Sequence, residues 1–475
     1  MYLPITSLLI LSPVLSLTIN LDDRDQVLLT ARRIADNLMN YYDESASQQG
    51  TIPPKVGDSE KGWQWYEGGI MWGLMLDYIR LSGNHTYGNT IVNGLTKASF
   101  GPIGSFLGSI PKLSETLEGK WNDDILWWAM AVTNAGELYG MNTIMPGGVS
   151  YLQLANLTYA QSWAQWDDKC GGGVWWSRDR NNLQNGGYKS TITNVQQILL
   201  GSHISYLIAD QSYNGKSIQI YNWLQQTGLL TARNLVNDGI RADKGCSINT
   251  AQYSYKSGIL AGGLAWLYKS SNNYQYMQAA QNVALQSLES FSKNDIITDP
   301  CEPDCTENAV TPKGAMIHGL GYVYEFSTDN QVKSNIKNKL SKSMTAMLNT
   351  CDSDYNCGNY WFDNQNKHQS VHYQINALHL ITAYLKTFPD LLTPSTNSQP
   401  APTNPPSFGS PSGPGSVADV RQSPSAILIV VFCALIIFFI TILALCFFSI
   451  RNAFKKGVKI ESSDMTTDAT IVEVI

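Results

Sequence analysis

The strongest constraint on the fold of this chain is an internal repeat. Six apolar stretches, most of them containing glycine, end near a tyrosine and recur about every 60 residues. The tyrosines that mark them are Tyr78, Tyr139, Tyr206, Tyr268, Tyr324 and Tyr384. The first stretch, which ends near residue 81, is apolar on most faces, as expected of a buried helix. A repeat of this length predicts helical units that bury their apolar faces against one another.

Amphipathic stretches alternate with the apolar ones. They cover residues 23–43, a shorter segment after Tyr87, and residues 149–166, 217–236, 274–291 and 332–349. Six outer and six inner helices predict an all-α fold, an (α/α)6 barrel or toroid of six helical hairpins over residues 20–390. In such a ring, the loops at one end of the inner helices line a cleft. An open helical solenoid is the alternative.

Segments of different composition flank the predicted domain. Residues 1–19 are typical of a secretory signal peptide. Residues 391–425 are rich in Pro, Ser, Thr and Gly and predict an extended stalk. Residues 426–450 are apolar over a length that can cross a bilayer, and the basic residues that follow place the tail, 451–475, in the cytoplasm. We therefore expect a single-pass type I membrane protein whose folded domain is extracellular or lumenal.

Cysteines and glycosylation motifs agree with a secretory route. The body of the chain has an even number of cysteines, which behind a signal peptide predicts disulfides. They are Cys170, Cys246, Cys301, Cys305, Cys351 and Cys357. The last four form two pairs that are close enough in sequence to close local loops, but the connectivity is left open. Asn84 and Asn156 begin N-glycosylation motifs, so both are predicted glycosylation sites.

Composition narrows the class of function. The net charge is −6 and the basic residues are scattered, so no basic stripe indicates a nucleic-acid partner. The chain has 13 Trp and 24 Tyr, which suits a carbohydrate-binding cleft, although large helical cores also use aromatic residues. No phosphate loop, dinucleotide motif or metal site is expected, and catalysis by two carboxylates would need no cofactor.

Chemistry is concentrated in residues 121–131, where Asp123 and Asp124 stand together between tryptophans. Acids in the first turn of a helix suit its dipole, and most such pairs serve only that purpose. However, apolar walls and a neighbouring negative charge also raise the pKa of one carboxyl group. One protonated acid beside one ionised acid is the division of labour that glycoside cleavage needs.

Several motifs in order resemble glycoside hydrolase family 76, the α-1,6-mannanases. The paired aspartates match the family's pair, residues 65–73 its aromatic–Glu–small–Gly inner helix, and residues 166–176 its CGGG(V/I)WW loop. Further matching segments are residues 188–190, 237–240, 255–258, 312–314 and 374–378. The likeness covers about residues 24–390. It departs from the family at Tyr255-Lys256-Ser257-Gly258, where Lys256 and Ser257 replace two amide side chains. It also departs at Pro312, where the family has Phe, and at Ser190, where the family has Asn.

The resemblance implies an (α/α)6 barrel and retaining cleavage, with Asp123 as the nucleophile and Asp124 as the general acid/base. Carboxyl groups about 5–5.5 Å apart suit a retaining pair, whereas an inverting pair needs about 6.5–9.5 Å to admit water. Consecutive side chains reach the shorter separation more easily. Both can address one bond only at the mouth of a helix.

The resemblance also suggests substrate-binding residues. They are Trp72, Trp127, Trp128, Asp168, Gly172, Gly173, Trp175, Trp176, Asp238 and Tyr255. Each type has a structural alternative: the glycines suit a tight turn, the tryptophans a core, and the loop aspartates a turn. Asp167 is an alternative to Asp168 as a partner for mannose hydroxyls.

Together these features predict a retaining endo-α-1,6-mannosidase or a mannan transglycosylase that acts on cell-wall or glycolipid mannan. Hydrolysis and transfer share the covalent intermediate and differ in what resolves it. A non-catalytic mannan- or glycan-binding, wall-organising protein is the alternative, motivated by the altered segment at Lys256.

Overall fold

The computed structural model describes residues 17–47, 49–52, 64–100, 104–108, 121–305, 312–362 and 370–392. The chain divides into two units, Met1–Ala401 and Pro402–Ile475, and every described residue belongs to the first. Nearly all of the predicted signal peptide and stalk, the whole predicted membrane span at 426–450, and the tail lie outside the described residues. Within the described residues, no helix is long and apolar enough to span a membrane.

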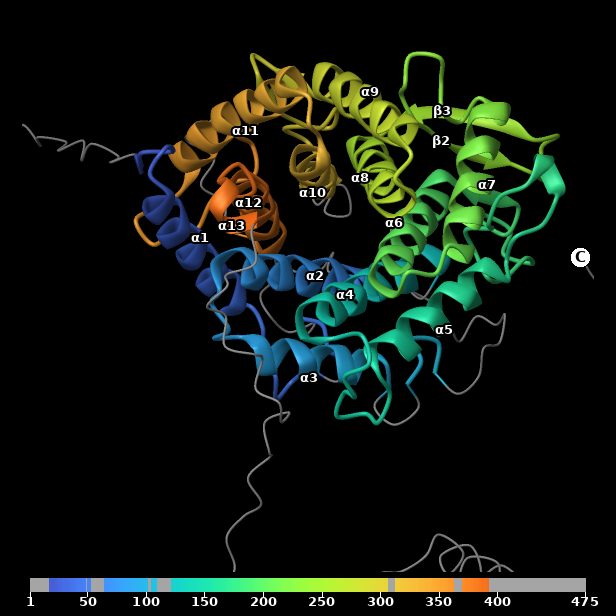
Figure 1. Cartoon of the computed structure of the whole chain (residues 1–475), viewed down its shortest axis with the longest axis horizontal. Coiled ribbons are helices and arrows are strands. Elements are labelled where there is room, and N and C mark those ends of the chain that lie inside the picture. Colours follow the sequence, from blue (N-terminus) through green and yellow to red (C-terminus); the bar gives the residue numbers. More distant parts are fainter. Residues whose placement is uncertain are drawn as a thin grey trace, which may run out of the picture. The chain divides into compact units, whose positions relative to one another are not determined.

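Among the described residues, six inner helices form a closed ring (Figure 1). Each contacts the next along the chain, and the last contacts the first. They are α2 (Trp65–Ser82), α4 (Asn122–Tyr139), α6 (Thr191–Ile208), α8 (Ser254–Ser271), α10 (Pro312–Phe326) and α12 (Val371–Leu385). Each contains one of the tyrosines that mark the repeat, so the predicted inner helices are confirmed.

Six outer helices pack around this ring in the same part of the chain (Figure 1). They are α1 (Arg24–Met39), α3 (Gly88–Ala98), α5 (Tyr151–Trp163), α7 (Ser212–Thr227), α9 (Tyr274–Ser290) and α11 (Asn330–Thr350), and a short helix, α13 (Pro389–Leu392), follows α12. The closed ring is the predicted toroid rather than an open solenoid. The helix predicted over 217–236 is wrong at both ends: it starts earlier, and Gly228, with φ of 77°, ends it.

Glycines in the repeat let inner helices touch backbone to backbone. At the crossing of α8 and α10, a Cβ atom on Gly258 would lie 2.3 Å from the Met316 Cα. A Cβ atom on Gly319 would meet the Gly258 carbonyl in the same way. Close packing of this kind leaves no room for a side chain at either position.

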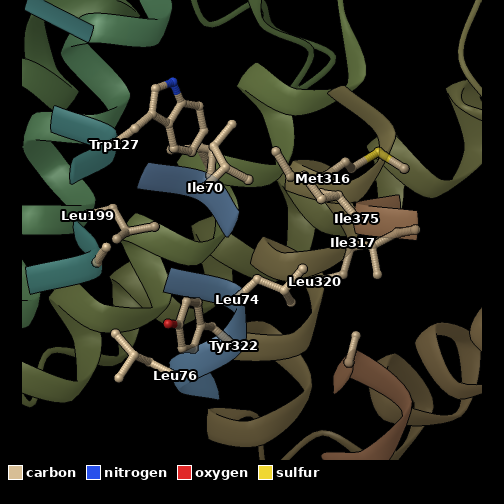
Figure 2. Packing of buried hydrophobic residues seen from close by; sticks show 14 of the residues in the cluster. Ile70, Leu74, Leu76, Trp127, Leu199, Met316, Ile317, Leu320, Tyr322 and Ile375 are labelled. Atoms are coloured by element: carbon tan, nitrogen blue, oxygen red, sulfur yellow. The ribbon is translucent and has the colours of Figure 1, made fainter. Parts of the chain in front are cut away.

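Apolar side chains fill the ring. Figure 2 shows part of this packing, including Ile70 of α2, Trp127 of α4 and Leu320 of α10. A cavity of about 30 Å³ remains between the inner helices, and its lining includes Trp127, His318 and His379. The volume is enough for a water molecule.

A small antiparallel sheet stands where two inner helices begin. Its strands, in the order β1-β2-β3, are β1 (Tyr188–Ser190), β2 (Asn237–Arg241) and β3 (Ser247–Gln252). The strand β1 runs directly into α6, and β3 ends just before α8. A second hairpin, β4 (Ser292–Lys293) with β5 (Ile296–Ile297), follows α9. The helical repeat did not predict these strands.

The described residues contain three disulfides, Cys170–Cys246, Cys301–Cys305 and Cys351–Cys357. The second and third are the two local pairs expected from spacing. The first joins the loop before β1 to the turn between β2 and β3. It therefore ties together two segments at the same end of the ring.

Candidate active site

The paired aspartates lie in the first turn of α4, and both are partly exposed. Asp124 supplies one half of a capping box, because its Oδ2 accepts a hydrogen bond of 2.7 Å from the Trp121 backbone N–H. This contact fixes one carboxylate at the helix mouth, where the positive end of the helix dipole favours negative charge.

Asp123 is held by a different set of donors. The Trp176 indole N–H donates to Asp123 Oδ2 at 2.7 Å, and the Asp124 backbone N–H donates to Asp123 Oδ1 at 3.1 Å. The Gln196 amide, from α6, donates to the Asp123 carbonyl at 3.3 Å. Both oxygens of the Asp123 carboxylate are therefore oriented by neighbours, and Trp176 comes from a distant loop.

That loop is built into the start of α4. The Asn122 side chain donates to the Trp175 carbonyl at 2.8 Å, and the Asn122 N–H donates to the Trp176 carbonyl at 3.2 Å. On its other side, the Trp176 N–H donates to the Tyr188 carbonyl at 3.1 Å. Residues 175–176 are thus fixed between α4 and β1, which directs the Trp176 indole at Asp123.

Two buried side chains anchor the preceding part of the loop. Asn194 of α6 accepts from the Val174 N–H at 2.8 Å and donates to the Val174 and Ser190 carbonyls at 3.0 and 2.9 Å. Lys189 is fully buried and donates to the carbonyls of Lys169 and Gly172, each at 2.7 Å. Each anchor comes from β1 or α6, so the loop is part of the scaffold.

The two carboxyl groups differ in electrostatics. Burial raises the pKa of Asp123 to about 6, although the Trp176 hydrogen bond and the charge of Lys256 act in the opposite direction. Burial, followed by the charge of Asp123, raises the pKa of Asp124 well above its usual range. At mildly acidic to neutral pH, Asp123 can therefore be ionised while Asp124 keeps its proton.

Two tyrosines face this pair from other helices. Tyr66 of α2 and Tyr255 of α8 are partly exposed. Burial raises the pKa of both phenols, and the charge of Asp123 acts in the same direction on each. Both phenols stay protonated and can donate hydrogen bonds to a ligand or an oxyanion.

Asp238 of β2 lies within a polar cluster beside the pair. Its carboxylate accepts hydrogen bonds from the Lys256 ammonium, the Tyr188 hydroxyl and the Asn249 amide, the last at 2.9 Å. The predicted contact of Asp238 with substrate stays a prediction, although protein donors already occupy both of its oxygens.

The predicted sugar platforms divide into two groups. Trp72 and Trp128 are fully buried: the Trp72 indole donates to the Gly50 carbonyl at 2.7 Å, and Trp128 stacks on Trp65 at 5.2 Å. Both belong to the core in this structure, and their role in binding substrate stays a prediction. Trp127 is 7% exposed and lines the cavity between the inner helices, and its role in binding substrate stays a prediction.

Trp175 is also largely buried, at 6% exposed, and its indole donates to Asp167 Oδ2 at 2.7 Å. Asp167 therefore holds the Trp175 side chain within the loop. Asp168 is exposed, and nothing in its surroundings distinguishes it as a substrate contact. Trp176 is partly exposed beside Asp123, which leaves it as the tryptophan of this loop that can meet a substrate.

Gly172 and Gly173 have left-handed φ values of 136° and 96°. A Cβ atom at Gly172 would lie 2.6 Å from the Trp166 ring, and one at Gly173 would lie 2.5 Å from the Trp223 ring. The close approach that these glycines allow is to tryptophans beneath the loop. This contact gives the two glycines a structural role, and their role in substrate binding stays a prediction.

Sequence reasoning missed Tyr66, Gln196 and the loop anchor Asn194. The family-like segment at residues 65–73 contains Tyr66, but nothing in the local pattern separates it from core aromatics. Gln196 and Asn194 lie on an inner helix whose buried polar residues were a detectable signal, because a buried amide needs a partner.

The predicted glycosylation sites lie away from this cluster. Asn84 follows α2, and its Oδ1 accepts from the Thr86 hydroxyl at 2.6 Å. Asn156 is in α5, and its Oδ1 accepts from the Tyr213 hydroxyl at 2.7 Å. Both side chains are partly exposed, and their glycosylation stays a prediction.

Two neighbouring carboxyl groups at the mouth of an inner helix, set in a closed ring of helical hairpins, suit glycoside cleavage by paired acids. The model of glycosyl hydrolase family 76 matches residues 27–395. The chain therefore belongs to glycosyl hydrolase family 76, and it is a glycoside hydrolase.

Relatives with known names agree. The chain is 26% identical over 373 residues to the mannan endo-1,6-alpha-mannosidase DFG5 of Candida albicans, covering 74% of this chain and 78% of that protein. It is 26% identical over 358 residues to the mannan endo-1,6-alpha-mannosidase DCW1 of Saccharomyces cerevisiae, covering 73% and 76%.

Solved structures support the same fold. Dfg5 from Chaetomium thermophilum, in complex with glucosamine, matches with a TM-score of 0.68 and 25% identity, over 78% of this chain and 92% of that one. An inactive variant of the α-1,6-mannanase GH76A of Salegentibacter, in complex with α-1,6-mannotriose, matches with a TM-score of 0.62. Its identity is 16%, over 76% of this chain and 99% of that one, so it bears on the fold alone.

Proposed function

We propose that this protein is a retaining endo-α-1,6-mannosidase or mannan transglycosylase, in which Asp123 is the nucleophile and Asp124 the general acid/base. The observation that carries the assignment is the difference between the two carboxyl environments. Asp123 accepts the Trp176 N–H and experiences the charge of Lys256, whereas burial and the Asp123 charge keep Asp124 protonated.

The chemistry follows from those states. Asp124 gives its proton to the glycosidic oxygen as that bond breaks, and Asp123 attacks the anomeric carbon to form a glycosyl ester. Asp124, now ionised, then takes a proton from the incoming nucleophile, which breaks the ester and restores both acids. Water completes hydrolysis, and a sugar hydroxyl completes transfer. Tyr66 and Tyr255 can donate hydrogen bonds to sugar oxygens during both steps.

The substrate class rests on the family and its named relatives. The relatives from Candida albicans and Saccharomyces cerevisiae are named for cleavage inside α-1,6-linked mannan. We extend that class, mannan or a mannose-containing glycan, to this chain.

We also propose that the domain acts on the non-cytoplasmic side of a membrane, tethered by residues 426–450. The three disulfides favour an oxidising compartment. Loss of mass at Asn84 and Asn156 after enzymatic deglycosylation is the expected result, and unmodified asparagines would count against this location.

The test uses the full-length protein with α-1,6-mannotetraose, analysed for shorter and longer products. The wild-type protein should give shorter products, longer products or both. Asp123→Asn and Asp124→Asn should each lower the rate of product formation by at least about a thousandfold. Binding of the tetrasaccharide with no product from wild type would instead support the non-catalytic alternative. Equal rates for wild type and both variants would overturn the assigned roles.

A further inference from the structure

Lys256 is a buried cation at the edge of the candidate active site. Its side chain is 2% exposed, and its ammonium lies 5.1 Å from the centre of the Tyr253 ring and 5.3 Å from that of the Tyr255 ring. A buried ammonium is costly unless it is paired. Its partner is the Asp238 carboxylate, and it also donates to the Asp238 carbonyl at 3.3 Å.

A chain of contacts leads from this ion pair to the proposed nucleophile. Asp238 accepts from the Tyr188 hydroxyl, and the Tyr188 ring packs edge-on against Trp176 at 5.8 Å. Trp176 in turn donates to Asp123 at 2.7 Å. Displacement of the ion pair would therefore move Tyr188 and Trp176, and with them the hydrogen bond that Trp176 donates to the Asp123 carboxylate.

The ammonium also acts on Asp123 through space, since its charge lowers the pKa of Asp123. Other titratable or charged groups surround the two. They are Tyr66 on α2, Asp124 on α4, Tyr188 on β1, Asp238 on β2, and Tyr253 and Tyr255 at the start of α8. Glu67, whose charge acts on Tyr66, pairs with His372 of α12 at 3.1 Å.

We propose that Lys256 is a positioning residue for the cleavage reaction, which keeps Asp123 ionised and in place through its charge and its ion pair with Asp238. This inference rests on the proposed function, because it takes Asp123 as the nucleophile. It assigns a role to the position where the chain departs from the family motif by carrying a lysine.

The protonation order agrees with this role. Burial lowers the pKa of Lys256 to about 7, against the effect of Asp123, and Asp123 titrates near 6. Below about pH 7 the ammonium is charged, so it opposes protonation of Asp123 over the range in which Asp123 would otherwise take up a proton. Removal of the charge should let Asp123 protonate at higher pH.

The test measures kcat/KM of the full-length protein on α-1,6-mannotetraose against pH. Lys256→Met, which keeps the length but not the charge, should move the acid limb of the profile to higher pH. Activity should fall about tenfold at about pH 5 and change little at about pH 7. Lys256→Arg should restore the wild-type limb. Lys256→Gln, whose amide can still bond Asp238, should shift the limb as Met does, and it provides the readout if the Met variant does not fold.

A matched control is Lys313→Met. Lys313 is also fully buried, and it pairs with Glu302 at 2.6 Å. It is a control because the lysine whose charge lowers the pKa of Asp123 is Lys256. Loss of Lys313 should lower the melting temperature without moving the acid limb. A uniform loss of activity across pH for Lys256→Met and Lys256→Gln, or an unchanged limb, would overturn the inference while leaving the proposed function intact. No activity in wild type would instead overturn the proposed function.

Discussion

At the scale of single residues, two aspartates have different proposed roles because their surroundings differ. Asp123 and Asp124 are adjacent on α4, yet an indole N–H holds the first and a backbone N–H the second. Burial raises both pKa values, and the charge of Asp123 raises that of Asp124 further. Burial of a carboxylate lowers stability, and such a destabilising feature is expected at a reactive site, where function and stability conflict.

That cost predicts a pH-dependent stability change. The folded-state pKa of Asp123 is about 6 instead of 3.8, so the folded protein holds this proton more tightly than the unfolded chain. Its contribution to stability is greatest below about pH 4 and is lost as the pH rises through 6. Asp123→Asn should therefore raise the free energy of unfolding by about 3 kcal/mol at about pH 8, with no gain at about pH 3.

Denaturant unfolding at the two pH values measures this difference. Asp23 is the matched control of opposite sign, because the Gln26 backbone N–H lowers the pKa of Asp23. Asp23→Asn should lose stability above about pH 4. An Asp123→Asn variant less stable than wild type at about pH 8 would contradict the claim that burial of this carboxylate is costly.

At the scale of elements, the loop at 167–178 matters as much as the helix that carries the aspartates. Disulfide Cys170–Cys246 ties it to the β2–β3 turn, and Lys189 and Asn194 hold its backbone. Apart from its tryptophans and the buried Val174, the loop has little apolar burial of its own. Its geometry therefore depends on hydrogen bonds from β1 and α6.

Asn194→Ala tests that dependence. The variant loses the bonds to the Val174 N–H and to the Val174 and Ser190 carbonyls. At about 1 kcal/mol for each net bond, stability should fall by about 3 kcal/mol. Since Val174 precedes Trp176 by two residues, kcat should also fall, by about tenfold, as Asp123 loses its fixed donor.

Asn134→Ala is the comparison, because Asn134 is a buried amide on α4 with one bond, to the Gly73 carbonyl at 3.3 Å. It should cost less stability and spare kcat. Equal losses of kcat in the two variants would show that the loop does not position Trp176.

At the scale of the whole molecule, the closed ring could be predicted from the sequence because its signal is repeated. Apolar glycine-containing helices and amphipathic helices alternate along the chain, and each pair buries its apolar faces against the neighbouring pairs. The contact of α12 with α2 closes the ring, as the number of repeats implied. The sheet could not be predicted, because its strands are short and β1 pairs with a β2 that lies about 50 residues later.

The candidate site was only partly predictable. The paired aspartates stood out by adjacency and by the tryptophans around them. Trp72 and Trp128 are buried in the core. Because an inner helix is apolar on most faces, sequence spacing cannot separate a core indole from one at the mouth of the helix. The glycines of the loop were expected to approach a ligand, and they approach Trp166 and Trp223 instead.

The central claim is that Asp123 is the nucleophile and Asp124 the acid/base, and azide rescue tests it most directly. With an α-1,6-mannobioside that carries an aryl leaving group, azide should reactivate Asp123→Ala and give the β-mannosyl azide, because azide takes the place of the missing carboxylate. Azide should reactivate Asp124→Ala and give the α-mannosyl azide, because it attacks the ester on Asp123. The opposite pair of anomers, or the α-azide from Asp123→Ala, would contradict the account.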